Sequence, residues 1–406
     1  GGRNSNSPPS AIPARCASFI MKILLQIIIL LTFTVCAFGQ NPKVTKYFNW
    51  YKKNYIIQNP SFAHSDTEIL FVRQFYIPDG HDAEGRELYV ESLISKADKE
   101  ERFADPVVSN LNLKTKKLTQ VDYGWTPTFS SDDKKIIYSY QTVPISGKRV
   151  LAETLNGNKI KMYNRHSKQY EIIASPEQTF LLDPIFLDST TIVYKIGDAV
   201  NGAYGGGVAF NQINILTNKN KPLYTAQKNH GLFNLVGDIY RTNNEIYYTV
   251  YIPQDSASWM ANKYSHLLLN SNGVVHDFGK GSFKSIEGKF GIDEEGGFTY
   301  LHDDHTLRTD KNILIKYKDN KILYKNELSF EYNKASMSPN GKYLLFYNSD
   351  NGIFIMDINT FTKTKITLPE TEVYSVVWSD NSTKLAIVQG HEKLRDTDLI
   401  SLFDVK

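Results

Sequence analysis

The chain has 406 residues, and 46 lysines and arginines are nearly balanced by 43 aspartates and glutamates, which leaves a formal net charge of +3. This balance does not provide the strongly basic surface of a nucleic-acid-binding protein, so no nucleic-acid partner is expected. The 25 tyrosines and 22 phenylalanines are typical of a chain built mainly from β-strands.

The N-terminal part of the sequence predicts an export signal. Residues 1–20 are polar, and we expect them to be an upstream non-native or disordered segment. Residues 21–39 carry a lysine, an apolar run over Ile23–Val35 and small residues before Gln40, which is the pattern of a cleaved signal peptide. The apolar run is shorter than the roughly 20 residues that a membrane-spanning helix needs. The mature protein is therefore expected to be periplasmic or secreted, without a membrane-spanning segment.

Both cysteines of the chain, Cys16 and Cys36, fall in this predicted leader. A mature chain from Gln40 then has no disulfide and no cysteine that could act as a metal ligand or nucleophile. Val35 stands where a lipoprotein signal needs a small residue, so lipid attachment at Cys36 is not expected. An exported product without cysteines fits a bacterial periplasm or the cell exterior.

Residues 40–60 are predicted to complete the fold of the rest of the chain. The C-terminal end supplies three predicted strands, Val373–Ser379, Lys384–Val388 and Leu399–Val405. A sheet of three strands would leave an edge exposed, so we predict that a strand within Val44–Ile57 pairs with it and closes the structure. A short helix packed on one end of the domain is the alternative.

From Ser61 onward the chain is a series of repeats. Each repeat has an aromatic residue or a methionine as an anchor, then a polar turn, then an apolar strand. The seven copies are Phe62–Val72, Phe129–Tyr138, Phe186–Tyr194, Tyr240–Tyr248, Phe290–Tyr300, Met337–Phe346 and Trp378–Ile387. Their anchors are about 40 to 67 residues apart. Several short strands in a period of about 50 residues indicate a propeller.

The copy over Ala335–Thr367 shows the unit most clearly, because tight turns separate its strand-length runs. A small antiparallel meander cannot bury both of its faces alone and needs copies of itself. We therefore predict an all-β fold, a single β-propeller over residues 61–406 with seven four-stranded blades. Six blades is the alternative, because the fifth copy is degenerate.

Two of the turns resemble a known family. Phe129–Asp133 (FSSDD) and Met337–Gly341 (MSPNG) are similar to the WD-like repeats of TolB-type β-propellers, in which an aromatic residue precedes Ser-Pro-Asp-Gly. The resemblance implies partner binding through a face or the central channel, and no chemistry of its own. The propeller domain of prolyl oligopeptidase-like enzymes has similar repeats, so a truncated protein of that kind is an alternative. The motif residues form turns and pack blades, and they predict fold better than function.

The loops between the second and third strands of the repeats are predicted to carry the function. They run approximately over Gln74–Asp105, Gln141–Asn158, Gly197–Ala209, Pro253–Tyr264, His302–Asn312, Asn348–Gly352 and Gly390–Asp398. Uneven loops on a rigid scaffold are where proteins place binding and catalysis. The candidate binding residues in these loops are His81, Arg86, Tyr204, Trp259, His302, Asp303, Asp304, His305, His391 and Arg395.

The segment His302–His305 is the densest group of metal-capable side chains among these candidates. Imidazoles and carboxylates suit Zn²⁺ or another divalent ion. However, two histidines three residues apart in a loop need a fixed turn to converge, and spacing identifies no third ligand. Metal binding therefore stays an open question, and no cofactor is predicted.

The sequence predicts the fold more clearly than it predicts any catalytic activity. The sequence has no Gly-x-Ser-x-Gly elbow, which argues against the usual serine-hydrolase arrangement, and no catalytic residue is assigned. We predict a monomeric propeller that binds a protein or cell-envelope partner. The alternative is a lyase or hydrolase acting on a polysaccharide or peptide at the long-loop face, because such sites draw on several blades and leave no local motif.

Overall fold

The computed structural model describes the chain from residue 41 to residue 406. The segments outside the described residues are 54, 76–105, 141–158, 175–178, 199–206, 226–227, 230–231, 234, 243–244, 255–263, 271, 282–289, 293–297, 307–308, 319–320, 329–333, 349–351, 369–370 and 395–396. The predicted leader at 1–39 lies outside them as well. In the part described, no helix is long and apolar enough to cross a membrane.

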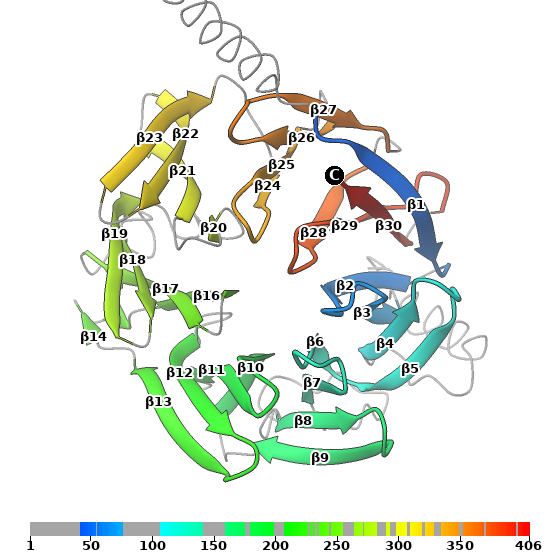
Figure 1. Ribbon diagram of the computed structural model, residues 1–406. Helices are drawn as coiled ribbons and strands as arrows, with labels where there is room; N and C mark the ends of the chain where they lie inside the picture. The colour runs from blue at the N-terminus through cyan, green and yellow to red at the C-terminus, as the bar shows by residue number, and fades with distance from the viewer. Residues whose placement is uncertain are drawn as a thin grey trace, which may run out of the picture.

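The described residues form thirty strands, and their sheets stand in a ring around a central axis (Figure 1). Five sheets have four strands, and a sixth has eight. The eight-stranded sheet consists of two four-stranded meanders, which are joined where Gly207 pairs with Val236. If each four-stranded meander is counted as a blade, the ring has seven blades, as the repeats predict. If each hydrogen-bonded sheet is counted once, the ring has six sheets. The fold is therefore the all-β propeller expected from the sequence.

The blades are numbered here in chain order. Blade 1 is β2 (Tyr55–Phe62), β3 (Glu68–Phe75), β4 (Val107–Asn112) and β5 (Leu118–Tyr123). Blade 2 is β6 (Trp125–Phe129), β7 (Lys135–Tyr140), β8 (Lys159–Asn164) and β9 (Gln169–Ala174). Blade 3 is β10 (Thr179–Phe186), β11 (Thr191–Asp198), β12 (Gly207–Asn214) and β13 (Lys219–Thr225). A small hairpin, β14 (Lys228–Asn229) and β15 (Leu232–Phe233), follows it.

The remaining blades complete the ring. Blade 4 is β16 (Leu235–Thr242), β17 (Glu245–Pro253), β18 (Tyr264–Asn270) and β19 (Gly273–Gly281). Blade 5 is β20 (Phe290–Ile292), β21 (Phe298–Thr306), β22 (Thr309–Lys318) and β23 (Lys321–Leu328). Blade 6 is β24 (Lys334–Met337), β25 (Tyr343–Asn348), β26 (Gly352–Asp357) and β27 (Lys363–Ile366). Blade 7 is β28 (Val373–Trp378), β29 (Lys384–Gly390), β30 (Asp398–Val405) and β1 (Val44–Tyr51).

Both ends of the described chain meet in blade 7. Strand β1 pairs with β30 in antiparallel register from Val44 opposite Val405 to Tyr51 opposite Leu399. Beyond the strands, the backbones of Lys43 and Lys406 exchange two hydrogen bonds of 2.9 and 3.0 Å. This confirms the prediction that an N-terminal strand supplies the missing fourth strand. Blade 1 itself begins at Tyr55, before the predicted boundary at residue 61.

Blades pack face to face, and the contact between blades 1 and 7 is a continuous apolar layer. Ile57 and Phe71 of blade 1 pack in one cluster with Val388 and Ile400 of blade 7, and each is at most 2% exposed. Burying such a side chain stabilises the folded state by about 1.5–3 kcal/mol. The layer therefore holds the first and last blades together where the ring closes.

The serine of the repeat motif folds the turn between the first two strands of a blade. In blade 2 the Ser130 hydroxyl donates to the Asp132 carboxylate (2.7 Å) and accepts the N–H of Lys135 (2.9 Å). Blades 6 and 7 repeat this arrangement with Ser338 and Ser379, and all three serines are fully buried. The motif is thus structural, because its hydrogen bonds are used within the turn.

The inner strands of the first three blades share a kink that the sequence analysis missed. Asn59, Thr126 and Asp183 have positive φ values of 48°, 46° and 46°, and each precedes a proline. The register of each inner strand shifts at the same point. A residue before proline is excluded from the right-handed helical region, and an extra residue in a strand is accommodated as a bulge. In blade 1 the bulge interrupts the ladder between Gln58 and Ser61, and the pairing resumes with Ser61 opposite Leu70.

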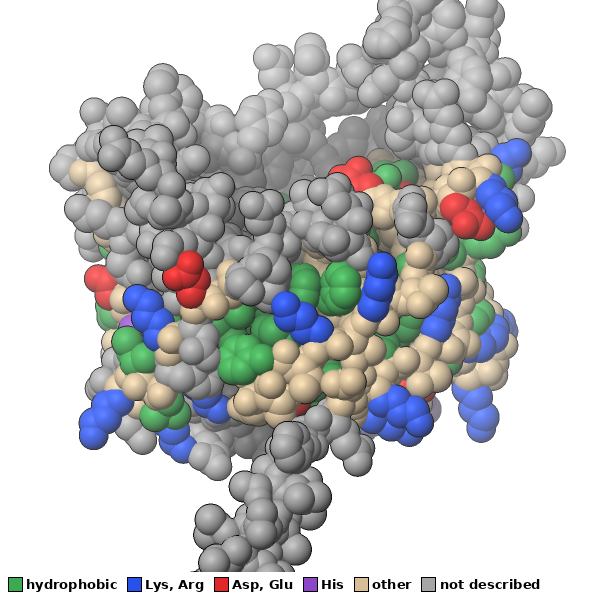
Figure 2. All heavy atoms as spheres, turned by 90° about the horizontal axis from the view of Figure 1, so that it is seen from above, with side chains coloured by type: hydrophobic (Ala, Val, Ile, Leu, Met, Phe, Trp, Pro, Cys, Tyr) green, Lys and Arg blue, Asp and Glu red, His purple; other side chains and the backbone are tan. Residues whose placement is uncertain are grey.

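On the side of the disc that Figure 2 shows, lysine and arginine side chains are distributed over the outer wall, with hydrophobic side chains and some acidic ones between them. The turns between third and fourth strands contribute several of the exposed lysines, as in Lys114, Lys116 and Lys117 of blade 1. The outer wall is therefore mixed in charge and carries many cations.

Candidate functional site

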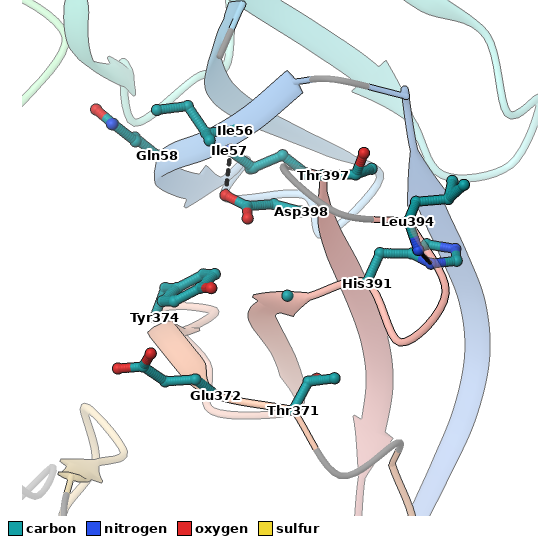
Figure 3. A pocket seen from close by; sticks show the side chains of 11 residues that line it. Ile56, Ile57, Gln58, Thr371, Glu372, Tyr374, His391, Leu394, Thr397 and Asp398 are labelled. Carbon is teal, nitrogen blue, oxygen red and sulfur yellow. Dashed lines mark hydrogen bonds between the residues drawn. The ribbon is translucent and has the colours of Figure 1, made fainter. Parts of the chain in front are cut away.

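A pocket of about 590 Å³ lies where blade 1 meets blade 7 (Figure 3). It is lined by Ile56, Ile57, Gln58, Thr371, Glu372, Tyr374, Gly390, His391, Leu394, Thr397 and Asp398. Its volume is within the range of small-molecule sites, about 300–1,000 Å³. The lining comes from the N-terminal half of the innermost strand β2, from the approach to β28, and from the loop between β29 and β30. The pocket thus opens on the face that carries the long loops.

The closure of the ring is what creates this pocket. Ile57 and Asp398 are 341 residues apart in sequence, yet the backbone N–H of Ile57 donates to Asp398 Oδ2 at 2.8 Å. Asp398 is the first residue of β30, where it pairs with Gly390, and its carboxyl group points into the pocket between Ile57 and Tyr374 (Figure 3). The site therefore exists only when the two ends of the propeller are in contact.

Asp398 is the most unusual group in the pocket. The residue is 6% exposed, and in the described part of the chain Ile57 is the donor to its carboxyl group. Burial raises the pKa of Asp398 to about 6, against the opposing effect of the Ile57 N–H. A carboxyl group that changes its charge near neutral pH in a pocket is typical of functional sites.

The loop between β29 and β30 presents His391 at the outer end of the pocket. The loop is closed at its base, where the N–H of His391 donates to the carbonyl oxygen of Thr397 at 2.8 Å. His391 Nδ1 accepts the N–H groups of Lys393 (3.2 Å) and Leu394 (3.3 Å). The proton of the neutral imidazole is therefore assigned to Nε2. The ring also packs edge-on against Tyr51 of the closing strand, with 4.5 Å between centroids.

Tyr374 and Glu372 form the wall of the pocket nearest the channel. Tyr374 is 45% exposed, and a Cβ atom at Gly390 would lie 3.2 Å from its hydroxyl oxygen. Glycine at 390 thus lets the tyrosine lie close against β29. On the same approach to β28, the hydroxyl of Thr371 accepts a hydrogen bond from Gln389 Nε2 at 2.7 Å, which anchors the segment.

The predicted candidates divide into three groups. His391 lies in the pocket. His81, Arg86, Tyr204, Trp259 and Arg395 lie outside the described residues. His302, Asp303, Asp304 and His305 lie on strand β21, opposite Ile313, Asn312, Lys311 and Asp310 of β22.

The prediction that His302–Asn312 is a long loop is wrong. Strands β21 and β22 extend through it and pair as far as Thr306 and Thr309. The polar composition suggested a loop, but backbone pairing overrides the weak strand preferences of such residues. The backbone of His302–His305 is therefore extended and does not form the turn that the two histidines would need to converge on a metal ion. In the part of the chain described, no group of three or more His, Cys, Asp or Glu residues could hold a metal ion.

Sequence reasoning missed Glu372, Tyr374 and Asp398. Asp398 marked the end of a predicted loop, but nothing in the local sequence indicated that its carboxyl group would be buried against the other end of the chain. Glu372 and Tyr374 precede and begin an ordinary strand. Predicting these three residues as a site would require knowing that blade 1 packs against blade 7.

No family model matches the chain, and no curated protein matches it. Among solved structures it is similar to an oligogalacturonate lyase in complex with manganese, with a TM-score of 0.54, 9% identity, and coverage of 91% of this chain and 99% of the other. The β-propeller domain of the Trilobed protease from Pyrococcus furiosus has a TM-score of 0.54 at 11% identity, with 87% and 94% covered. The chain is a β-propeller.

A second oligogalacturonate lyase, from Vibrio parahaemolyticus, has a TM-score of 0.50 at 11% identity, with 90% of this chain and 98% of that chain covered. At these identities the similarity shows the fold alone. The Pyrococcus propeller is described as having an open velcro topology. In the present chain, β1 pairs with β30 and completes blade 7.

Proposed function

We propose that the protein is an exported binding module whose ligand enters the pocket between blades 1 and 7. The observation that carries the proposal is Asp398, a buried carboxyl group that points into the pocket and is held by one backbone N–H. Burying a carboxyl group with one hydrogen-bond donor among the described residues is unfavourable for folding, and a ligand group that pairs with it would offset this cost.

The partner is proposed to be a protein or cell-envelope component. The resemblance of the turns to TolB-type repeats supports this class of partner, and the leader at 21–39 supports export. The position of the pocket supports it as well, because loops on one face of a rigid ring are suited to recognition. The mature chain from Gln40 is the form to which the proposal applies.

Binding can be tested with a defined library of envelope glycans and short peptides, screened against the mature chain by thermal shift and confirmed by calorimetry. The Asp398→Asn variant keeps an oxygen to accept the Ile57 N–H and removes the charge. Glu171→Gln, an exposed carboxylate on β9 of blade 2, is the matched control. We expect a ligand whose affinity falls in Asp398→Asn and is unchanged in Glu171→Gln. Equal affinity in all three proteins would contradict the proposal.

One observation favours a second candidate, an enzyme acting on a polysaccharide or peptide in the same pocket. A general acid or base works best with a pKa near the working pH, and Asp398 has a pKa of about 6. The similarity to oligogalacturonate lyases adds only that this fold can carry such an activity. Product analysis on the same library decides between the two functions: turnover that is lost in Asp398→Asn supports the enzyme, and binding without turnover supports the module.

A further inference from the structure

The pocket has a charge that sets it apart from the outer wall. Its lining includes the carboxyl groups of Asp398 and Glu372, and no lysine or arginine is among the described residues that line it. The side of the disc shown in Figure 2 carries many lysine and arginine side chains. The mature chain from Gln40 is neutral overall, because residues 1–39 contain three of the 46 lysines and arginines and none of the 43 aspartates and glutamates. An acidic recess in a protein without net charge is selective for ligands by charge, because the low-dielectric walls focus the field of the carboxyl groups.

The two acidic groups lie at different depths in the pocket: Asp398 is buried and Glu372 is exposed. The Asp398 carboxyl group is deep in the pocket and has one oxygen bonded to the Ile57 N–H. Glu372 and the Tyr374 ring lie on the wall nearest the channel, and Leu394 and His391 lie at the opposite end (Figure 3). A ligand group entering from the channel side would pass an aromatic face and then meet a carboxyl group.

We infer that this pocket binds a positively charged group, an alkylammonium or guanidinium, carried by a segment of the partner. The inference rests on the proposed function and adds the chemical class of the ligand. The buried Asp398 carboxylate would accept a charge-assisted hydrogen bond with its second oxygen, which is stronger than a neutral hydrogen bond. The face of Tyr374 can add a cation–π contact, and Glu372 attracts the cation at the entrance.

The same arrangement predicts a pH dependence. The titratable groups that face Asp398 are Glu372 ahead of β28, Tyr374 on β28 and His391 after β29; β2 contributes Ile56, Ile57 and Gln58, which are uncharged. Because the pKa of Asp398 is raised to about 6, the group is mostly neutral at pH 5 and mostly ionised at pH 7.5. Affinity for a cation is therefore expected to increase about tenfold between these two pH values.

The test uses the mature chain and small probes that differ in charge at nearly constant shape. N-acetyl-lysine methylamide and N-acetyl-arginine methylamide carry the cations, N-acetyl-norleucine methylamide is the neutral isostere, and cadaverine is a free diamine. Affinities are measured by NMR titration at pH 5 and pH 7.5. Binding of the lysine or arginine probe supports a peptide source for the cation, and stronger binding of cadaverine supports a free amine.

The variants separate charge from shape. We expect Asp398→Asn to weaken binding of the cationic probes about tenfold or more, since a hydrogen bond to a buried charged group is lost. Glu372→Gln, near the entrance, should weaken it about twofold to fivefold. Glu171→Gln, on the outer strand β9, should leave it unchanged. Glu372→Gln keeps the test valid if Asp398→Asn does not fold.

Two results would overturn the inference in distinguishable ways. If the norleucine probe binds as tightly as the lysine probe, and Asp398→Asn weakens both equally, the pocket is a binding site but not one for cations. If no probe perturbs the pocket residues, and no ligand from the library does so either, the proposed function fails together with the inference.

Discussion

Two carboxylates contact opposite ends of blade 1 and differ in their hydrogen-bond donors. Asp398 lies at the pocket end of the seam between blades 1 and 7, and the half-buried Asp133 of blade 2 lies at the end with the short turns. At the end with the short turns, Asp133 of blade 2 accepts the N–H groups of His64 and Ser65 of blade 1, each at 2.9 Å. The His64 ring lies 3.4 Å from that carboxylate through Nδ1, and its Nε2 lies 2.9 Å from Asp380 Oδ2 of blade 7. At the pocket end, Ile57 is the one donor to Asp398 among the residues that the structure describes.

The pKa values follow from this difference. Burial alone would raise the pKa of Asp133, but the hydrogen bonds from His64 and Ser65 outweigh it and hold that pKa well below its usual range. Burial raises the pKa of Asp398 to about 6, because one N–H does not compensate for the lost water. A carboxylate supplied with several donors holds blades together, whereas one supplied with a single donor is available for a ligand.

Removing the closing strand should have the largest effect, because blade 7 loses its fourth strand. Deletion of residues 41–51 leaves β30 as an exposed edge and removes the chain connection that places β2 beside blade 7. We expect the shortened chain to aggregate or to lose its cooperative thermal transition. The chain from Gln40 is the control, and an unchanged melting curve would show that the closing strand does not support the seam.

Replacing Asp133 should destabilise the protein substantially. Asp133→Ala leaves the N–H groups of the half-buried His64 and the exposed Ser65 without their acceptor, which costs about 1–2 kcal/mol in the free energy of unfolding. Because the folded-state pKa is lowered, the stabilisation is present above the ordinary aspartate pKa of about 3.9 and is lost as the pH falls. Urea denaturation at pH 7 and in acid measures this. An equal loss at both pH values would contradict the assignment.

Replacing Asp398 should change stability less than replacing Asp133 does. The pH dependence of stability that Asp398 causes should have the opposite sign. Since its folded-state pKa is raised, wild-type stability decreases as the pH rises from about 4 through 6, when the buried group must ionise. Asp398→Asn should remove this decrease and leave the protein as stable as the wild type or more so at pH 7.5, within about 1 kcal/mol. Thermal melts across pH 4–8 measure it. A large loss at pH 7.5 would make Asp398 a structural group like Asp133.

The smallest effect is expected at Gly390. An added Cβ atom would meet the Tyr374 hydroxyl at 3.2 Å, so the tyrosine must shift by a few tenths of an ångström. Gly390→Ala should change stability by no more than about 0.5 kcal/mol, because Tyr374 is partly exposed and can move. The shift should still lower ligand affinity measurably by calorimetry. Glu171→Gln, on the outer strand β9 of blade 2, is the control for affinity.

The turns and strands were the most predictable part of the molecule. Ser130, Ser338 and Ser379 mark turns because each hydroxyl forms its hydrogen bonds within five residues in the chain. The anchors Phe62, Phe129 and Phe186 fall at the ends of inner strands, as their spacing predicts. The segment His302–His305 was predicted to be a loop because its side chains are polar. It is a strand because its backbone pairs with β22.

The sequence by itself determined the repeat, the all-β class and the need for an N-terminal strand in blade 7, because turn chemistry, strand periodicity and an unpaired edge are local properties. The tertiary structure alone decided where the pocket lies and which carboxyl group it buries. Asp398 reaches Ile57 across 341 residues of sequence. No local pattern encodes such a contact, because it forms only when all the blades have been placed around the ring and the last is packed against the first.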